Sequence, residues 1–269
     1  MIAICRTLYA QLRANPAHAS ELVSQLLKGE WVQVLNWGDH WSEIKTEHGY
    51  SGWARTAQLW LVPAAQIELL RHCTLRLNAK TASFEMDENT AKKLGVDAFL
   101  PAYFQSPSSA KPNPGWDTIA FTQTAKSFLE VPYVWGGKTP FGLDCSGLVQ
   151  LVMNLNGYSF PRDAWQQAEI GEEISFNPDE PDFEEGDLLY FQNPGKPIHH
   201  VAISLGKDLY LHASEWVRIN SLDPDSPFFA DERRQTLTRA CKIKEAHLEP
   251  LSRSFKRLVD LVDGADIAL

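Results

Sequence analysis

The segment from Pro132 to Leu148, PYVWGGKTPFGLDCSGL, places one cysteine where a glycine-rich and aromatic loop passes into an apolar helix. Beyond Cys145, apolar residues recur at the spacing of one helix face: Leu148, Leu151, Val152 and Leu155. Gly157 is expected to end this helix. Backbone N–H groups at a helix N-terminus favour the anionic thiolate, which is the nucleophilic form of cysteine. The segment therefore predicts that Cys145 is a nucleophile with a lowered pKa.

Two downstream histidines supply the other groups that an activated thiol needs. His200 lies in HHVAI and His212 in LHASE, and both segments read as β-strands. We predict His200 as the general base that takes the thiol proton, and His212 as the residue that fixes its tautomer. His199 is expected on the opposite face of its strand, where it either lines a substrate groove or faces solvent. Because neighbouring strand residues face opposite sides, these histidines are not expected to share a metal ion.

The composition narrows the classes of partner. The 269 residues carry a formal net charge of -9 without a basic run, which argues against nucleic acid or an anionic membrane as partner. The four cysteines form no C-x-x-C pair, so neither a zinc knuckle nor a redox dithiol is indicated. No segment approaches the roughly 18 apolar residues of a membrane helix, and the apolar N-terminal stretch is too short for a signal peptide. We therefore expect a globular protein without metal or cofactor that is cytoplasmic, with export as a mature form that has lost its leader as the open alternative. The sequence carries no signal of its oligomeric state.

The composition and the spacing of apolar residues change several times along the chain. Residues 1–62 contain short β-rich runs separated by tight turns, which predicts a small all-β barrel. Residues 63–115 are interpreted as a shortened second barrel module followed by a Pro/Ser-rich linker, SPSSAKPNPG. Residues 116–243 place helices before a run of strands, which is an α+β arrangement. Residues 244–269 contain helical spacing and are expected to form an amphipathic helix.

The individual elements follow from the same patterns. In the first region the predicted strands are Trp31–Trp37, His40–Gly49 and Tyr50–Ala54. In the α+β region, helices are expected over Phe121–Leu129, from Cys145 to Gly157 and over Ala164–Ile170. The strands expected after them are Leu188–Phe191, Val201–Leu205, Leu209–Ser214 and Val217–Asn220.

Five motifs within residues 117–243 resemble the NlpC family of bacterial cell-wall peptidases, whose fold is a circularly permuted form of the papain fold. In chain order they are P-Y-V-W-G-G, D-C-S-G-L-V-Q, P-R-D-A, E-G-D-L-L-Y-F, and H-V-A-I followed by L-H-A-S. Upstream, GEWVQVLNWGDHWSEIKTEHGYSGWA is similar to the bacterial SH3-like domain, with its G-Y-x-G-W signature. The resemblance implies a papain-like catalytic domain preceded by an SH3-like barrel.

The resemblance also implies roles for residues around the nucleophile. Tyr133 matches the family tyrosine, whose hydroxyl would join the Cys145 backbone N–H in an oxyanion hole. Trp135 is expected to wall the groove. Asp144 and Ser146, which flank the nucleophile, are expected to bear on substrate specificity.

A further set of residues is implied for substrate selection. The family includes γ-D-glutamyl-L-diamino-acid endopeptidases, in which a closed pocket recognises the free ammonium of an N-terminal L-Ala. The aspartate of the R-D motif and a tyrosine of the SH3-like domain do this, and they match Asp163 and Tyr50 here. An acidic residue of an early SH3-like loop also contributes, for which Glu21 is the candidate. Asp163 is equally placed to be the N-cap of a helix that begins at Ala164, and the two roles are compatible.

These residues together predict a cysteine peptidase acting on murein peptides. The expected reaction is hydrolysis of the amide between the γ-carboxyl of D-Glu and the following L-Lys or diaminopimelate, in cell-wall peptide recycling. Two alternatives stay open. A papain-like amidase or acyltransferase would use the same groups on another substrate, and a catalytically silent protein would only bind wall fragments. The silent protein would lack Cys145, His200 or His212, and all three are present.

Overall fold

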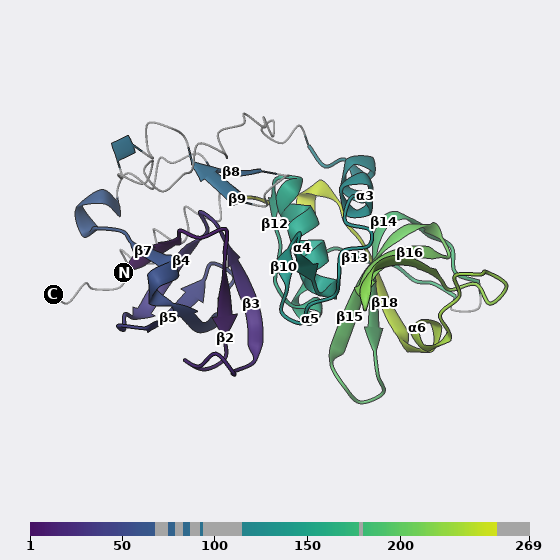
Figure 1. Ribbon diagram of the computed structural model, residues 1–269. Coiled ribbons are helices and arrows are strands. Elements are labelled where there is room, and N and C mark those ends of the chain that lie inside the picture. Colours follow the sequence, from purple (N-terminus) through teal and green to yellow (C-terminus); the bar gives the residue numbers. More distant parts are fainter. Residues whose placement is uncertain (68–74, 79–82, 87–91, 94–114, 178–179, 252–269) are drawn as a thin grey trace. The chain divides into compact units, whose positions relative to one another are not determined.

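The computed structural model describes residues 1–67, 75–78, 83–86, 92–93, 115–177 and 180–251 (Figure 1). The chain divides into two compact units, Met1–Pro112 with Pro250–Leu269, and Asn113–Glu249. Each unit has a β-sheet and a buried apolar cluster of its own. The division falls beside the segment predicted as a linker, of which residues 106–114 lie outside the described residues.

The first unit is built on a seven-stranded antiparallel sheet with the strand order β3-β2-β6-β5-β4-β1-β7. Its strands are β1 Ile2–Cys5, β2 Tyr9–Arg13, β3 Leu22–Leu27, β4 Trp31–Asn36, β5 Trp41–Thr46, β6 Ser51–Arg55 and β7 Leu59–Leu61. A short 3-10 helix, η1 Thr56–Gln58, precedes β7. Because successive side chains of a strand point to opposite faces, residues such as Leu12, Val32 and Ile44 point into a common core. At Gly52 of the G-Y-x-G-W signature, a Cβ atom would lie 2.7 Å from the Leu12 side chain, so only glycine fits.

The three strands predicted in this unit correspond to β4, β5 and β6, with ends that differ by a few residues. Downstream lie the 3-10 helix η2, Ala64–Gln66, and a hairpin in which β8, Leu75–Asn78, pairs with β9, Ser83–Met86. The rest of the region interpreted as a second barrel module lies outside the described residues. That interpretation therefore stays a prediction.

The second unit combines helices with a six-stranded antiparallel sheet in the order β13-β18-β14-β15-β16-β17. The sheet strands are β13 Glu172–Glu173, β14 Phe183–Gln192, β15 Ile198–Lys207, β16 Leu209–Ser214, β17 Trp216–Ser221 and β18 Leu237–Lys242. The helices are α3 Thr118–Lys126, α4 Cys145–Leu155, α5 Ala164–Gln167 and α6 Asp231–Thr236. Short strands β10 Lys138–Thr139 and β11 Gly142–Leu143 form a hairpin before α4, and β12 Tyr158–Ser159 follows it. Helices α3, α4 and α5 lie together beside the sheet (Figure 1).

Helix α4 is the central helix of this unit. Every residue from Cys145 to Asn154 is buried, as expected for a helix packed on all sides. It contacts α3, β15 and β16, and this packing sets its first turn against the sheet. The first turn approaches the preceding loop so closely that a Cβ on Gly147 would lie 2.1 Å from the Gly137 carbonyl oxygen. The glycine of the D-C-S-G motif therefore fixes where Cys145 sits.

The structure contains elements that were not predicted, among them β1, β2, β3 and β7 of the first unit and α6 of the second, and two further departures concern β18 and the C-terminal region. Strand β18 was not predicted, although it pairs with β14 in the middle of the sheet. In the predicted C-terminal helix, residues 245–250 instead form a 3-10 helix, η5 Glu245–His247, and a two-residue strand, β19 Glu249–Pro250. Pro250 lacks the N–H that a continuing helix needs. Residues 252–269 lie outside the described residues.

Candidate active site

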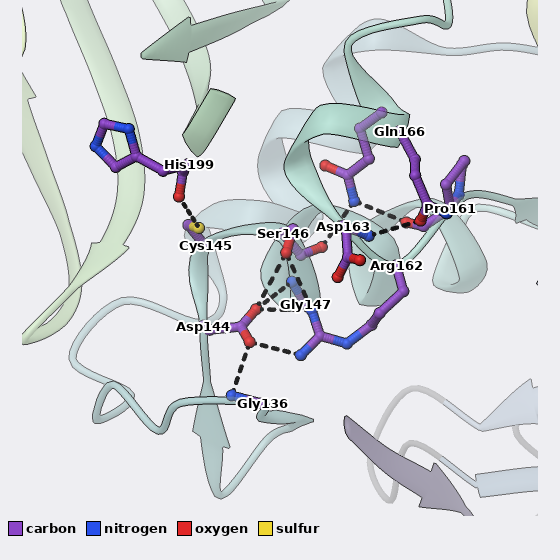
Figure 2. A network of polar contacts seen from close by, with 11 residues as sticks. Gly136, Asp144, Cys145, Ser146, Gly147, Pro161, Arg162, Asp163, Gln166 and His199 are labelled. Atoms are coloured by element: carbon purple, nitrogen blue, oxygen red, sulfur yellow. Dashed lines mark hydrogen bonds and ion pairs between the residues drawn. The ribbon is translucent and has the colours of Figure 1, made fainter. Parts of the chain in front are cut away.

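Cys145 is the first residue of α4, and its sulfur faces strand β15. The thiol lies 4.0 Å from the His199 carbonyl oxygen, and the Val201 backbone N–H donates a hydrogen bond to the sulfur. These two residues flank His200 in the strand, so the sulfur is held beside the predicted base. Figure 2 shows the His199 ring directed away from the sulfur, as strand alternation predicts. His199 is exposed, whereas only 7% of Cys145 and 5% of His200 are accessible.

The two predicted histidines meet across the sheet. His200 Nε2 lies 2.7 Å from His212 Nδ1, and both rings are buried. This hydrogen bond uses His200 Nε2, so the other ring nitrogen, Nδ1, is not part of it. The geometry is that of a base held by an orienting residue.

Asn220 in β17 extends this line of hydrogen bonds, and the sequence analysis missed it. Its Nδ2 donates to the Phe228 carbonyl oxygen at 2.8 Å, which turns Oδ1 toward His212 Nε2 at 2.9 Å. Because an amide oxygen only accepts, His212 donates from Nε2 and accepts at Nδ1. His200 therefore donates from Nε2, and its Nδ1 carries a lone pair. Asn220 thus sets the tautomers of both histidines.

The position of Asn220 could have been inferred from the pairing of residues in the hairpin formed by β16 and β17. Strands β16 and β17 pair His212 with Arg218 and Tyr210 with Asn220. Residues two apart in register share a face and reach each other diagonally. The predicted strands and their short connection therefore place Asn220 on the face of His212.

Burial sets the pKa values of the nucleophile and the base. The resulting neutral thiol differs from the thiolate that the sequence predicted. Burial, with the Asp144 carboxylate nearby, raises the pKa of the Cys145 thiol to about 11. Burial and the neighbouring His212 lower the pKa of His200 well below its usual value, and burial lowers the pKa of His212 to about 4. Desolvation thus outweighs the helix N-terminus, and the prediction of a lowered thiol pKa is wrong. At neutral pH the thiol and both imidazoles are therefore neutral.

A buried ion pair anchors the start of α4. Asp144 is the N-cap, and its carboxylate accepts from the Gly147 N–H at 2.7 Å and the Gly136 N–H at 2.9 Å. Arg162 donates to the same carboxylate at 3.0 and 2.5 Å, and to the Ser146 hydroxyl at 3.0 Å (Figure 2). The side chains of Asp144 and Ser146 thus have partners within the protein. Their contact with substrate stays a prediction.

Tyr133 lies beside the strand that leads into the nucleophile. It forms a parallel bridge with Leu143, and its N–H donates to the Glu215 carbonyl at 2.9 Å. Burial, followed by the neighbouring Cys145 and the Asp144 carboxylate, raises the pKa of the Tyr133 phenol well above its usual value. The hydroxyl therefore stays a proton donor, as the predicted oxyanion role requires. Trp135 is 63% exposed, and its part in the groove stays a prediction.

Asp163 occupies the N-cap of α5, as the sequence predicted. Its N–H donates to the Gln166 side-chain oxygen at 3.2 Å. Burial raises the pKa of the Asp163 carboxyl, although the neighbouring Arg162 opposes the shift. A carboxylate that is partly desolvated gains from a nearby cation. Its position is therefore compatible with the predicted contact to a ligand ammonium.

Glu21 and Tyr50 belong to the first unit, whereas Asp163 belongs to the second. Tyr50 packs against the core of its sheet and follows β5, and Glu21 is exposed just before β3. Their role in a shared substrate pocket stays a prediction.

The described part of the chain holds no cluster of three or more His, Cys, Asp or Glu side chains able to bind a metal ion. Among the same residues, no helix is long and apolar enough to cross a membrane.

A cysteine at the start of a buried helix, beside a histidine on an antiparallel sheet, defines the class of papain-like cysteine peptidases. Residues 130–237 match the NlpC/P60 family, and residues 12–59 match the bacterial dipeptidyl-peptidase Sh3 domain. The chain is 30% identical over 277 residues to dipeptidyl-peptidase 6 of Lysinibacillus sphaericus, covering 88% of this chain and 98% of that protein. The chain belongs to the NlpC/P60 family.

Two further comparisons agree with this membership. A gamma-D-glutamyl-L-lysine dipeptidyl-peptidase of Bacillus subtilis is 33% identical over 213 residues, covering 69% of this chain and 67% of that protein. The crystal structure of an NlpC/P60 family protein from Bacillus cereus superposes with a TM-score of 0.67 at 17% identity, covering 90% of this chain and 99% of that one. The likeness of fold therefore covers both the SH3-like region and the papain-like region of the chain.

Proposed function

We propose that this protein is a cysteine peptidase that cleaves the bond between D-Glu and the following L-Lys or diaminopimelate in peptides derived from peptidoglycan. The relatives support a cell-wall peptidase of the NlpC/P60 type. One observation carries the proposed catalytic groups: the hydrogen bonds from Asn220 through His212 leave His200 Nδ1 as an acceptor, and the Cys145 sulfur lies against the backbone of the residues on either side of His200.

The reaction proceeds in two steps from these groups. The Cys145 sulfur attacks the γ-carbonyl carbon of D-Glu while its proton passes to His200 Nδ1. The resulting oxyanion is stabilised by the Cys145 backbone N–H and the Tyr133 hydroxyl. His200 then gives its proton to the departing amine, and the C–N bond breaks to leave a thioester. Water, activated by His200, hydrolyses the thioester and restores the thiol.

The free L-Ala end is the second part of the proposal. Its ammonium would pair with the partly buried Asp163 carboxylate, with Tyr50 and Glu21 of the first unit as further contacts. A requirement for a free end suits peptides already released from the wall, and this is why we propose a role in recycling.

The test is cleavage of L-Ala-γ-D-Glu-L-Lys by the full chain, followed by mass spectrometry of the products. Cys145→Ala should abolish cleavage, whereas Cys241→Ala, which removes another buried thiol of the same unit, should retain it. Acetylating the L-Ala amine should weaken recognition by about 2–5 kcal/mol, because Asp163 is then left unpaired. Turnover by Cys145→Ala would overturn the nucleophile, and equal rates on both substrates would overturn the pocket. Transfer to an added amine in place of water would identify an acyltransferase.

A further inference from the structure

We propose that Arg233 on α6 binds a carboxylate group of the residue that leaves when the peptide bond is cleaved. This inference rests on the proposed function, and it extends the site to the side that reads the diamino acid. No motif in the sequence singled this residue out.

Arg233 is connected to the candidate triad through the ring of Phe191. Its guanidinium carbon is 5.8 Å from the centre of the Phe191 ring, and that ring is 5.5 Å from the ring of His200. Helix α6 packs on β14, the neighbour of β15 in the sheet, which explains this placement. The charge of Arg233 also contributes to the lowered pKa values of His199, His200 and His212.

Among the described residues Arg233 has no anionic partner, whereas three other arginines of the second unit have one. Arg162 pairs with Asp144, Arg218 with Glu215, and Arg239 with Glu169. Within the described residues the Arg233 side chain forms no ion pair and no hydrogen bond, although the residue is only partly exposed. A guanidinium that has lost part of its water without gaining a carboxylate is prepared to bind one from a ligand.

The position of Arg233 identifies which carboxylate this is. Arg233 lies on the His200 side of the site, because the Phe191 ring is close both to the Arg233 guanidinium and to the His200 ring. His200 must face the departing amine in order to protonate it. The residue that carries this amine therefore lies on the Arg233 side of the sulfur.

The departing residue offers a carboxylate at one of two places. Its α-carboxylate is attached to the same carbon as the departing amine when the peptide ends there. Diaminopimelate carries another carboxylate at the far end of its side chain, which lysine lacks. Both are bidentate acceptors of the kind that a guanidinium recognises.

The experiment compares three substrates with the full chain: L-Ala-γ-D-Glu-L-Lys as the free acid, the same peptide as its C-terminal amide, and the diaminopimelate tripeptide with its α-carboxyl amidated. We expect the wild type to show a kcat/KM on the acid roughly 10- to 100-fold above that on the amide, the range of a charge-assisted pair. Arg233→Gln should reduce this ratio to within about twofold. Arg234→Gln, the same change one position along α6, should keep the wild-type ratio.

The outcomes separate the two proposals. A fast reaction on the amidated diaminopimelate peptide that Arg233→Gln loses would identify the side-chain carboxylate as the group bound. If Arg233→Gln lowers all three rates equally, its role is to support Phe191 and His200, and the inference is overturned while the proposed function stands. If the wild type cleaves none of the substrates, the proposed function fails and the inference falls with it.

Discussion

At the scale of single residues, reactivity depends on a line of hydrogen bonds in which each donor has a defined acceptor. Asn220 accepts from His212, and His212 accepts from His200. Burial keeps the thiol and both imidazoles neutral at neutral pH. We therefore expect the proton to leave Cys145 as the sulfur attacks, with no stable ion pair beforehand.

The first prediction concerns alkylation of Cys145 by iodoacetamide. Since burial raises the pKa of this thiol to about 11, the thiolate fraction should grow about tenfold for each pH unit between 6 and 9. The alkylation rate should rise in proportion. Peptide mass mapping at each pH separates Cys145 from the other cysteines, and buried Cys241 serves as an internal reference. A rate that stays level below pH 7 would indicate a thiolate–imidazolium pair instead.

A second prediction concerns Asn220 as a positioning residue. Asn220→Ala removes the acceptor that fixes the His212 tautomer, so kcat should fall roughly 10- to 100-fold with KM little changed, the range seen when an outer partner of a functional histidine is lost. Asn220→Asp keeps an acceptor and adds a negative charge, which raises the pKa of the histidine pair. The acidic limb of its pH–rate profile should therefore move to higher pH. An unchanged kcat in Asn220→Ala would contradict the tautomer assignment.

Some residues of the site could be predicted from the sequence, and others could be identified only from the structure. Cys145, His200 and His212 stand in motifs whose chemistry follows from residue type and order. Asn220 required the cross-strand register, and Arg233 required the packing of a short helix, neither of which a motif encodes. The thiol pKa was mispredicted because it depends on how deeply α4 is buried, and this depth arises from tertiary packing.

At the scale of elements, α4 is fixed by the buried pair of Asp144 and Arg162. Asp144 caps the helix, while Arg162 joins it to the segment that precedes α5. The pair thus ties the nucleophile and Asp163 to one small network (Figure 2).

The prediction at this scale is a double-mutant cycle on that pair. Arg162→Met should lower the free energy of unfolding by about 3–5 kcal/mol, because it leaves a buried carboxylate without its cation. Adding Asp144→Asn should recover part of this loss, since asparagine still caps the helix and carries no charge. Urea denaturation of the two single variants and the double variant measures the coupling. Strictly additive losses would show that the pair is not coupled.

At the scale of the whole molecule, composition shifts along the chain anticipated the two units, and short β-rich runs anticipated the sheet of the first. The order of helices before strands gave the α+β class of the second. Strand β18 was missed because its pattern, LTRACK, follows the short helix α6 and lacks clear alternation. Its place beside β14 is a long-range pairing that local patterns do not specify.

The backbone carbonyl of Phe228, which lies in a surface loop, affects the protonation of the buried His200. It holds the Asn220 amide in one of two orientations that differ by half a turn. In the reverse orientation every hydrogen bond in the line would exchange donor and acceptor, and His200 Nδ1 would carry a hydrogen in place of a lone pair. The conformation of the loop that carries Phe228 thus determines whether His200 Nδ1, three hydrogen-bonded residues away, can accept a proton.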